Sequence, residues 1–162
     1  GILSWGQDLD HETSPFQVNL AYQVPRNKQS DYIGKAELER QRNVIDSGEA
    51  PFKMKMVGII FGGKEITDYA PDFWLVADTD GNDMGYVTSP WWSPELETNI
   101  ALAWVPWSSS EVGTKLVVKL PDEYSLSPGE PVEGEVVDVP FRESVNPNKR
   151  EVEAAKGKDF AE

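Results

Sequence analysis

The side chains best suited to acid–base or metal chemistry lie in one polar stretch near the beginning of the chain. Asp8, Asp10 and Glu12 place three carboxylates within five residues, and His11, the single histidine, lies among them. An imidazole beside carboxylates can act as a general base or a metal ligand. In a polar turn, however, such side chains more often face solvent. We therefore predict no catalytic residue and no metal ligand here.

A second acidic stretch, Asp78–Asp83, has the composition of a calcium-binding loop. An EF-hand loop requires glycine at its sixth position and glutamate at its twelfth. Here Gly81 is the fourth residue, and the residues 84–88 that follow are typical of a strand, not of a helix. The pattern therefore favours a β-hairpin turn over a calcium site.

Two adjacent tryptophans could contact a flat ligand. Trp91 and Trp92 lie within Ser89–Pro94, and because proline cannot donate a hydrogen bond to a sheet, we predict a loop that presents both indoles. Such a loop could stack a heterocycle or dock against a neighbouring domain. It could equally cover the open end of a barrel, and the sequence leaves these alternatives open.

The cations near the end of the chain form a candidate anion site. Arg142, Lys149 and Arg150 flank the polar segment 144–148. An acidic protein that binds an anion must concentrate its cations locally. The alternative is a set of surface ion pairs, which contribute little to stability.

The composition of the whole chain narrows the functional classes. Its 162 residues include 15 Lys and Arg against 28 Asp and Glu, which gives a net charge of −13. This acidity argues against binding to nucleic acids and to anionic membranes. The absence of cysteine excludes disulfides and thiolate nucleophiles and fits a reducing, cytoplasmic location.

The elements that must position these side chains fall into two groups. Before residue 51 we expect a strand at Phe16–Val24, a loop at Pro25–Ser30 and a helix at Lys35–Asp46. After it, strand-forming runs recur between turn residues, which is typical of an all-β barrel or sandwich. These runs are Met54–Phe61, Phe73–Ala77, Met84–Thr88, Ile100–Val105, Lys115–Leu120 and Val132–Val139.

Several motifs, in order along the chain, resemble the C-terminal part of the glycine cleavage T-protein (aminomethyltransferase) family. The stretch Trp5–Phe16 resembles the family pattern YG-x-D-[IM]-D-x-x-x-[ST]-P, and Asp31–Leu38 resembles its helix start, DFIGKEAL. Further similar segments are Gly85–Ser89, Asn99–Pro106 and Pro140–Arg142. The ordered set covers nearly the whole chain.

The resemblance implies a mainly β fold with a C-terminal Greek-key-like β-barrel at residues 51–145. Residues 1–50 would be a small α+β segment (strand, loop, helix) from a larger folate-binding body, and residues 146–162 a tail. Because the chain opens on Gly1 and family members are longer, we expect a fragment whose missing N-terminal part is its partner. The catalytic residues would lie in that part, so we predict that this chain alone is inactive.

The resemblance also implies a cofactor, tetrahydrofolate, and two residues that contact it. Tyr22 falls where relatives have an aromatic residue beside the folate, and Arg150 where some have an arginine that binds the glutamyl carboxylate. One departure concerns Thr67–Pro71, which lacks the cation that some relatives place there. The folate tail would then be held differently, or the site would suit another substrate.

The implied reaction is one-carbon transfer from a methyl or aminomethyl donor to tetrahydrofolate. An aminomethyl donor would involve a lipoyl carrier protein. Trp91–Leu96 and Ser144–Glu151 look most like the demethylase branch, which takes methyl groups from small molecules such as methoxy-aromatics or dimethylsulfoniopropionate. The alternatives are a non-catalytic folate-binding relative and a stand-alone β-barrel module that binds a protein partner through its two tryptophans.

Overall fold

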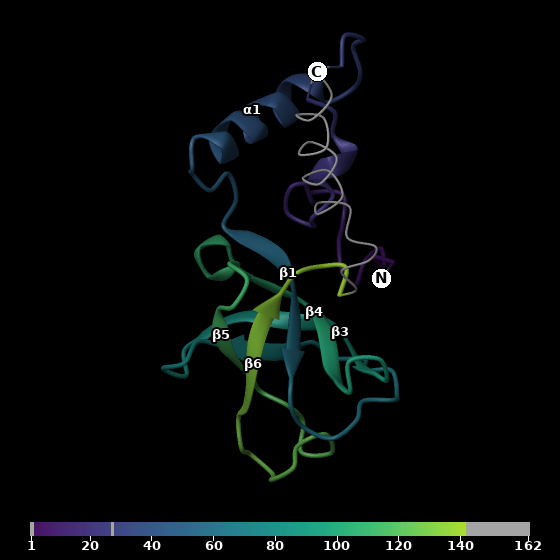
Figure 1. Cartoon of the computed structure of the whole chain (residues 1–162), viewed down its shortest axis with the longest axis vertical. Helices are drawn as coiled ribbons and strands as arrows, with labels where there is room; N and C mark the ends of the chain where they lie inside the picture. The colour runs from purple at the N-terminus through teal and green to yellow at the C-terminus, as the bar shows by residue number, and fades with distance from the viewer. Residues whose placement is uncertain (1, 27, 142–162) are drawn as a thin grey trace, which may run out of the picture.

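The computed structural model describes residues 2–26 and 28–141, which form a β-barrel preceded by a segment of turns and one helix (Figure 1). The helix α1 (Lys35–Asp46) lies at one end of the molecule and the barrel at the other (Figure 1). The strands are β1 (Met54–Phe61), β2 (Trp74–Ala77), β3 (Asp83–Ser93), β4 (Thr98–Pro106), β5 (Lys115–Val118) and β6 (Val132–Val137). Two short 3-10 helices are η1 (Ala21–Gln23) and η2 (Trp107–Ser109).

The strands close into an antiparallel barrel in the order β1–β4–β3–β2–β5–β6, and β6 pairs with β1. β2, β3 and β4 form a meander and β1 lies beside β4, which is the strand order of a Greek key. The predicted mainly β fold with a C-terminal barrel is therefore confirmed.

The predicted hairpin turn between β2 and β3 is also present. The Asp78 carboxylate accepts hydrogen bonds from the backbone N–H groups of Asp80 at 3.0 Å and Asn82 at 2.8 Å. Gly81 has a φ of +89°, which favours glycine. Through these hydrogen bonds, the Asp78 carboxylate stabilises the turn.

The barrel interior is filled by small and branched apolar side chains. On β4, Ala101, Ala103 and Val105 belong to this core. Their neighbours Leu102 and Trp104 instead belong to a second apolar cluster, which includes Val18 of the N-terminal segment. Because side chains alternate along a strand, β4 contacts the barrel core on one face and the N-terminal segment on the other.

Helix α1 has the predicted bounds, and polar contacts attach it to the segment before it. The Ser14 hydroxyl donates to Oε1 of the buried Gln41 at 2.6 Å. The Arg26 guanidinium donates two hydrogen bonds to the Asp46 carboxylate, at 2.7 and 3.2 Å. The helix and the N-terminal segment are thus joined before the chain enters β1.

The strand predicted at Phe16–Val24 is wrong. The backbone turns there: the N–H of Leu20 donates to the Pro15 carbonyl at 2.9 Å, and Asn19 has a φ of +59°. Phe16 and Val18 are nevertheless buried, so alternating burial arises without an extended backbone. Val18 packs with Met56 and Trp104 of the barrel, whereas the Phe16 ring lies beside the Arg42 guanidinium of α1. Contacts with two different elements thus produce the period of two that normally identifies a strand.

The loop predicted at Ser89–Pro94 is also wrong, because β3 continues to Ser93. The pairing of β2 with β3 ends at Val87, so Pro90 has no strand beside it on that edge. The backbone N–H of Trp92, two residues further on, donates to the carbonyl of Ile66, so this N–H points away from β4. The nitrogen of Pro90 faces the same way, and its missing N–H removes no hydrogen bond from the β3–β4 pair.

Candidate functional site

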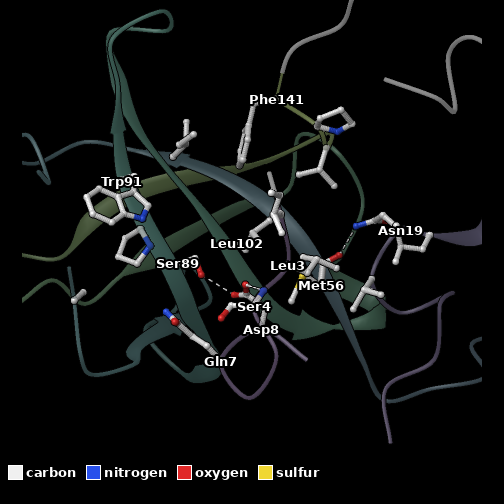
Figure 2. Close-up of a pocket in the computed structure, with 18 of the residues that line it drawn as sticks. Leu3, Ser4, Gln7, Asp8, Asn19, Met56, Ser89, Trp91, Leu102 and Phe141 are labelled. Carbon is white, nitrogen blue, oxygen red and sulfur yellow. Dashed lines mark hydrogen bonds between the residues drawn. The ribbon is translucent and has the colours of Figure 1, made fainter. Parts of the chain in front are cut away.

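A cavity of about 670 Å³ lies between the N-terminal segment and the outer face of β3 and β4 (Figure 2). Most of its lining is apolar and includes Leu3, Leu20, Met56, Leu102 and Phe141. We call this cavity the cleft. Its walls come from residues 2–22, from the barrel and from residues 139–141, so its shape depends on how the N-terminal segment is held against the barrel.

A buried carboxylate holds the two sides of the cleft together. Asp8 is 2% exposed, and its Oδ1 accepts hydrogen bonds from the hydroxyls of Thr88 and Ser89, each at 2.6 Å. Its Oδ2 accepts from the backbone N–H of Ser4 at 2.8 Å, and its backbone carbonyl accepts from Nε1 of Trp104 at 2.9 Å. Figure 2 shows Asp8 between Ser4 and Ser89. Both oxygens of the carboxylate are therefore engaged in positioning the segment.

The solvent-facing role expected for Asp8 is thus incorrect, and the reason lies in β3. Thr88 is the extra residue of a β-bulge, because Val87 pairs with Ala103 while Ser89 pairs with Leu102. The hydroxyls of the consecutive residues Thr88 and Ser89 both reach Asp8. The sequence signal for this contact is a Thr-Ser pair in a strand together with an aspartate 80 residues earlier. Nothing in the local sequence connects the two.

Four aromatic residues line the cleft, Tyr22, Tyr69, Trp91 and Phe141, and two of them are the residues singled out from the sequence. Tyr22, on η1, is 38% exposed, and its hydroxyl accepts a hydrogen bond from the Gln23 amide at 3.2 Å. Trp91, on β3, is 45% exposed and pairs with Ile100, another cleft residue. Because Trp91 and Trp92 are neighbours in a strand, their indoles point to opposite faces, and only Trp91 lines the cleft.

The chemistry of the cleft is that of a binding surface. Among its described lining residues there is no Lys, Arg or His, and Asp8 is its one carboxylate. Besides the hydroxyls of Tyr22 and Tyr69, the other polar side chains of this described lining are those of Ser4, Gln7, Asn19 and Ser89. The Asn19 amide already donates to the Met56 carbonyl at 2.8 Å. Apolar walls with few polar groups suit a flat organic ligand.

The cations predicted near the end of the chain fall in a part that the structure does not describe. Arg142, Lys149, Arg150 and the segment 144–148 lie outside the described residues. The loop at Thr67–Pro71, where a cation is lacking, does reach the cleft through Tyr69 and Ala70.

The other acidic candidates remain at the surface. Asp10 and His11 are exposed, and hydrogen bonds from the Glu12 N–H and the Thr13 hydroxyl hold the pKa of Asp10 below its usual value. Within residues 2–26 and 28–141, no group of three His, Cys, Asp or Glu side chains could hold a metal ion.

The helices among the same residues are α1 and the two short 3-10 helices η1 and η2. None of them is long and apolar enough to cross a membrane.

Comparison with known proteins gives one family match. Residues 50–142 match the model of the glycine cleavage T-protein C-terminal barrel domain. An aminomethyltransferase from Synechococcus sp. (strain WH7803) is 34% identical over 116 residues, which are 72% of this chain and 29% of that protein. An aminomethyltransferase from Geobacillus sp. (strain WCH70) is 30% identical over 137 residues, which are 85% of this chain and 33% of that protein.

A solved structure shares the fold. The crystal structure of glycine cleavage system aminomethyltransferase T from Bartonella henselae has a TM-score of 0.64 and 23% sequence identity. The match covers 88% of this chain and 36% of that one. The chain thus spans about a third of the length of the proteins that it matches.

Proposed function

Since the chain belongs to the glycine cleavage T-protein family, whose C-terminal barrel domain it contains, we propose that it is the C-terminal part of a tetrahydrofolate-dependent aminomethyl- or methyltransferase. The relatives named aminomethyltransferase, which are about two and a half times as long, support this proposal. The catalytic residues would belong to the preceding part of the longer polypeptide. The cysteine-free composition supports a cytoplasmic location.

The observation that carries the proposal is the apolar, aromatic-lined cleft. Tyr22 and Trp91 would pack on the flat rings of tetrahydrofolate, as aromatic side chains do on heterocycles. The glutamyl carboxylates need a cation, and none is present among the described lining residues. We assign that role to Arg150, because a guanidinium binds a carboxylate through two hydrogen bonds.

In the reaction, this chain would position the acceptor. Bound tetrahydrofolate supplies a ring nitrogen that accepts the one-carbon group. Tyr22 and Trp91 restrain the rings, while Leu20 and Leu102 exclude water from this side of the site. Asp8 keeps the two walls at a fixed separation. The donor would be an aminomethyl group on a lipoyl carrier protein or a methyl group on a small molecule, as in the demethylase branch.

Isothermal titration calorimetry of this chain with tetrahydrofolate tests the cleft. We expect binding that weakens about tenfold in Trp91→Ala and in Tyr22→Ala, since each removes one stacking surface. Phe73→Ala is the matched control, because Phe73 is also an exposed aromatic residue but does not line the cleft. Equal affinity in all four proteins, or no binding to the unmodified chain, would contradict the proposal.

A further inference from the structure

A second, smaller cavity lies between α1 and the barrel and gathers positive charge. Its volume is about 240 Å³, and its lining includes Arg26, Arg42, Lys55 and Trp107. Against these three cations, the described lining residues include one carboxylate, Asp46. The chain as a whole carries a net charge of −13, so this local excess of cations is unusual for the molecule.

Two of the cations are held in place by the surrounding structure. The Arg42 guanidinium donates to the Val24 carbonyl at 2.5 Å and lies 5.1 Å from the ring centre of Phe16. Arg26 binds Asp46, and this contact holds the pKa of the Asp46 carboxyl below its usual value. The Arg42 guanidinium is therefore held in place before any ligand arrives, while the Asp46 carboxylate balances the charge of Arg26.

Lys55 provides the third cation from β1, on the opposite wall. Its ammonium lies 5.1 Å from the ring centre of Trp107, and within the described residues it makes no hydrogen bond or salt bridge. Burial lowers the pKa of Lys55, and the negative charge of Asp138 acts in the opposite direction. A half-buried ammonium that makes no hydrogen bond to the described part of the chain gains most from an anion that enters the cavity.

We propose that this cavity binds a small oxyanion, such as inorganic phosphate or a short carboxylate. Its volume suits a ligand of a few heavy atoms, Arg42 of α1 and Lys55 of β1 supply positive charge, and Trp107 adds an apolar ring to the lining. Asn19 lines both this cavity and the cleft, so the two sites adjoin. The proposal does not depend on folate binding, because it concerns different charged residues and a different ligand.

The test is a titration of the ¹⁵N-labelled chain with sodium phosphate, followed by NMR, with sodium chloride at matched ionic strength as the reference. We expect saturable shifts of the Trp107 indole N–H and of the Lys55 and Arg42 amides with phosphate only. A parallel titration with sodium acetate distinguishes a phosphate site from one that accepts any oxyanion. Shifts that are absent, or identical with chloride, would overturn the proposal.

Variants at Lys55 show whether its charge is responsible. Lys55→Met keeps an apolar stem against Trp107, and we expect it to weaken phosphate binding at least tenfold. Lys55→Arg should retain binding. Lys53→Met removes the same charge from an exposed residue that does not line this cavity, and should bind as the unmodified chain does. Should Lys55→Met not fold, Lys55→Gln provides the same comparison, and unweakened binding in the folded variant would overturn the proposal.

Discussion

At the scale of single residues, Asp8 shows how little of a buried polar contact is visible in a sequence. Its neighbours Asp10 and His11 are exposed, as the polar composition of the stretch predicts. Asp8 is buried because two hydroxyls of a strand 80 residues away and one backbone N–H converge on its carboxylate. Composition predicts the average environment of a stretch, whereas the contacts of one side chain depend on which distant element packs against it.

Replacing Asp8 should therefore destabilise the attachment of the N-terminal segment. We expect Asp8→Ala to lower the free energy of unfolding by about 3 kcal/mol, because it leaves the buried hydroxyl of Thr88 without its charged acceptor. Urea unfolding followed by tryptophan fluorescence measures the change.

Asp10→Ala is the control for Asp8→Ala, since it removes the same charge from an exposed position two residues away. It should change the free energy of unfolding by less than about 0.5 kcal/mol. Equal effects of the two substitutions would show that Asp8 does not hold the segment.

At the scale of elements, the predictions succeeded where local propensity and packing agree. The helix Lys35–Asp46 has its predicted bounds, and β1 coincides with its predicted strand. The two failures, at 16–24 and 89–94, both arise from contacts with other elements. In the first, turns place Val18 against the barrel and Phe16 against α1, so that alternate side chains are buried. In the second, β3 extends beyond its pairing with β2, so a proline at position 90 costs no hydrogen bond between strands.

The close approach of β3 and β4 gives a prediction for the barrel. A Cβ atom on Gly85 would overlap the backbone carbonyl of Trp104, so the strands would have to separate. We expect Gly85→Ala to lower the free energy of unfolding by about 3 kcal/mol, the cost of forcing extra volume into packed structure. Thermal unfolding followed by circular dichroism measures this.

Gly62→Ala is the matched control for Gly85→Ala. An added Cβ at Gly62 meets its nearest neighbour, a Val132 methyl group, at an ordinary contact distance of 3.4 Å. It should therefore destabilise the barrel much less. If Gly85→Ala were tolerated as well as Gly62→Ala, the packing of β3 on β4 would differ from that described.

At the scale of the whole molecule, fold and site differ in how far the sequence predicts them. The barrel follows from its recurring strand runs and from the family resemblance. The cleft does not, because Tyr22, Trp91 and Phe141 come from three separate parts of the chain. The family resemblance alone assigns Tyr22 to folate binding, and its position in the cleft supports the proposed role.

The last prediction concerns catalysis by the chain on its own. The cleft contains no free carboxylate, histidine or cysteine among its described lining residues, and the chain spans 29% of the Synechococcus relative. General acid–base catalysis needs a titratable group within reach of the substrate. We therefore expect that the chain alone transfers no one-carbon group to tetrahydrofolate, whereas a longer polypeptide that carries the preceding family domains does so.

Mass spectrometry of the folate product measures this transfer. Separate reactions with aminomethyl-loaded lipoyl carrier protein and with small methyl donors identify the donor. Turnover by the chain alone would place catalytic residues within it, while a longer polypeptide that binds folate but is inactive with both donor classes would indicate a non-catalytic relative.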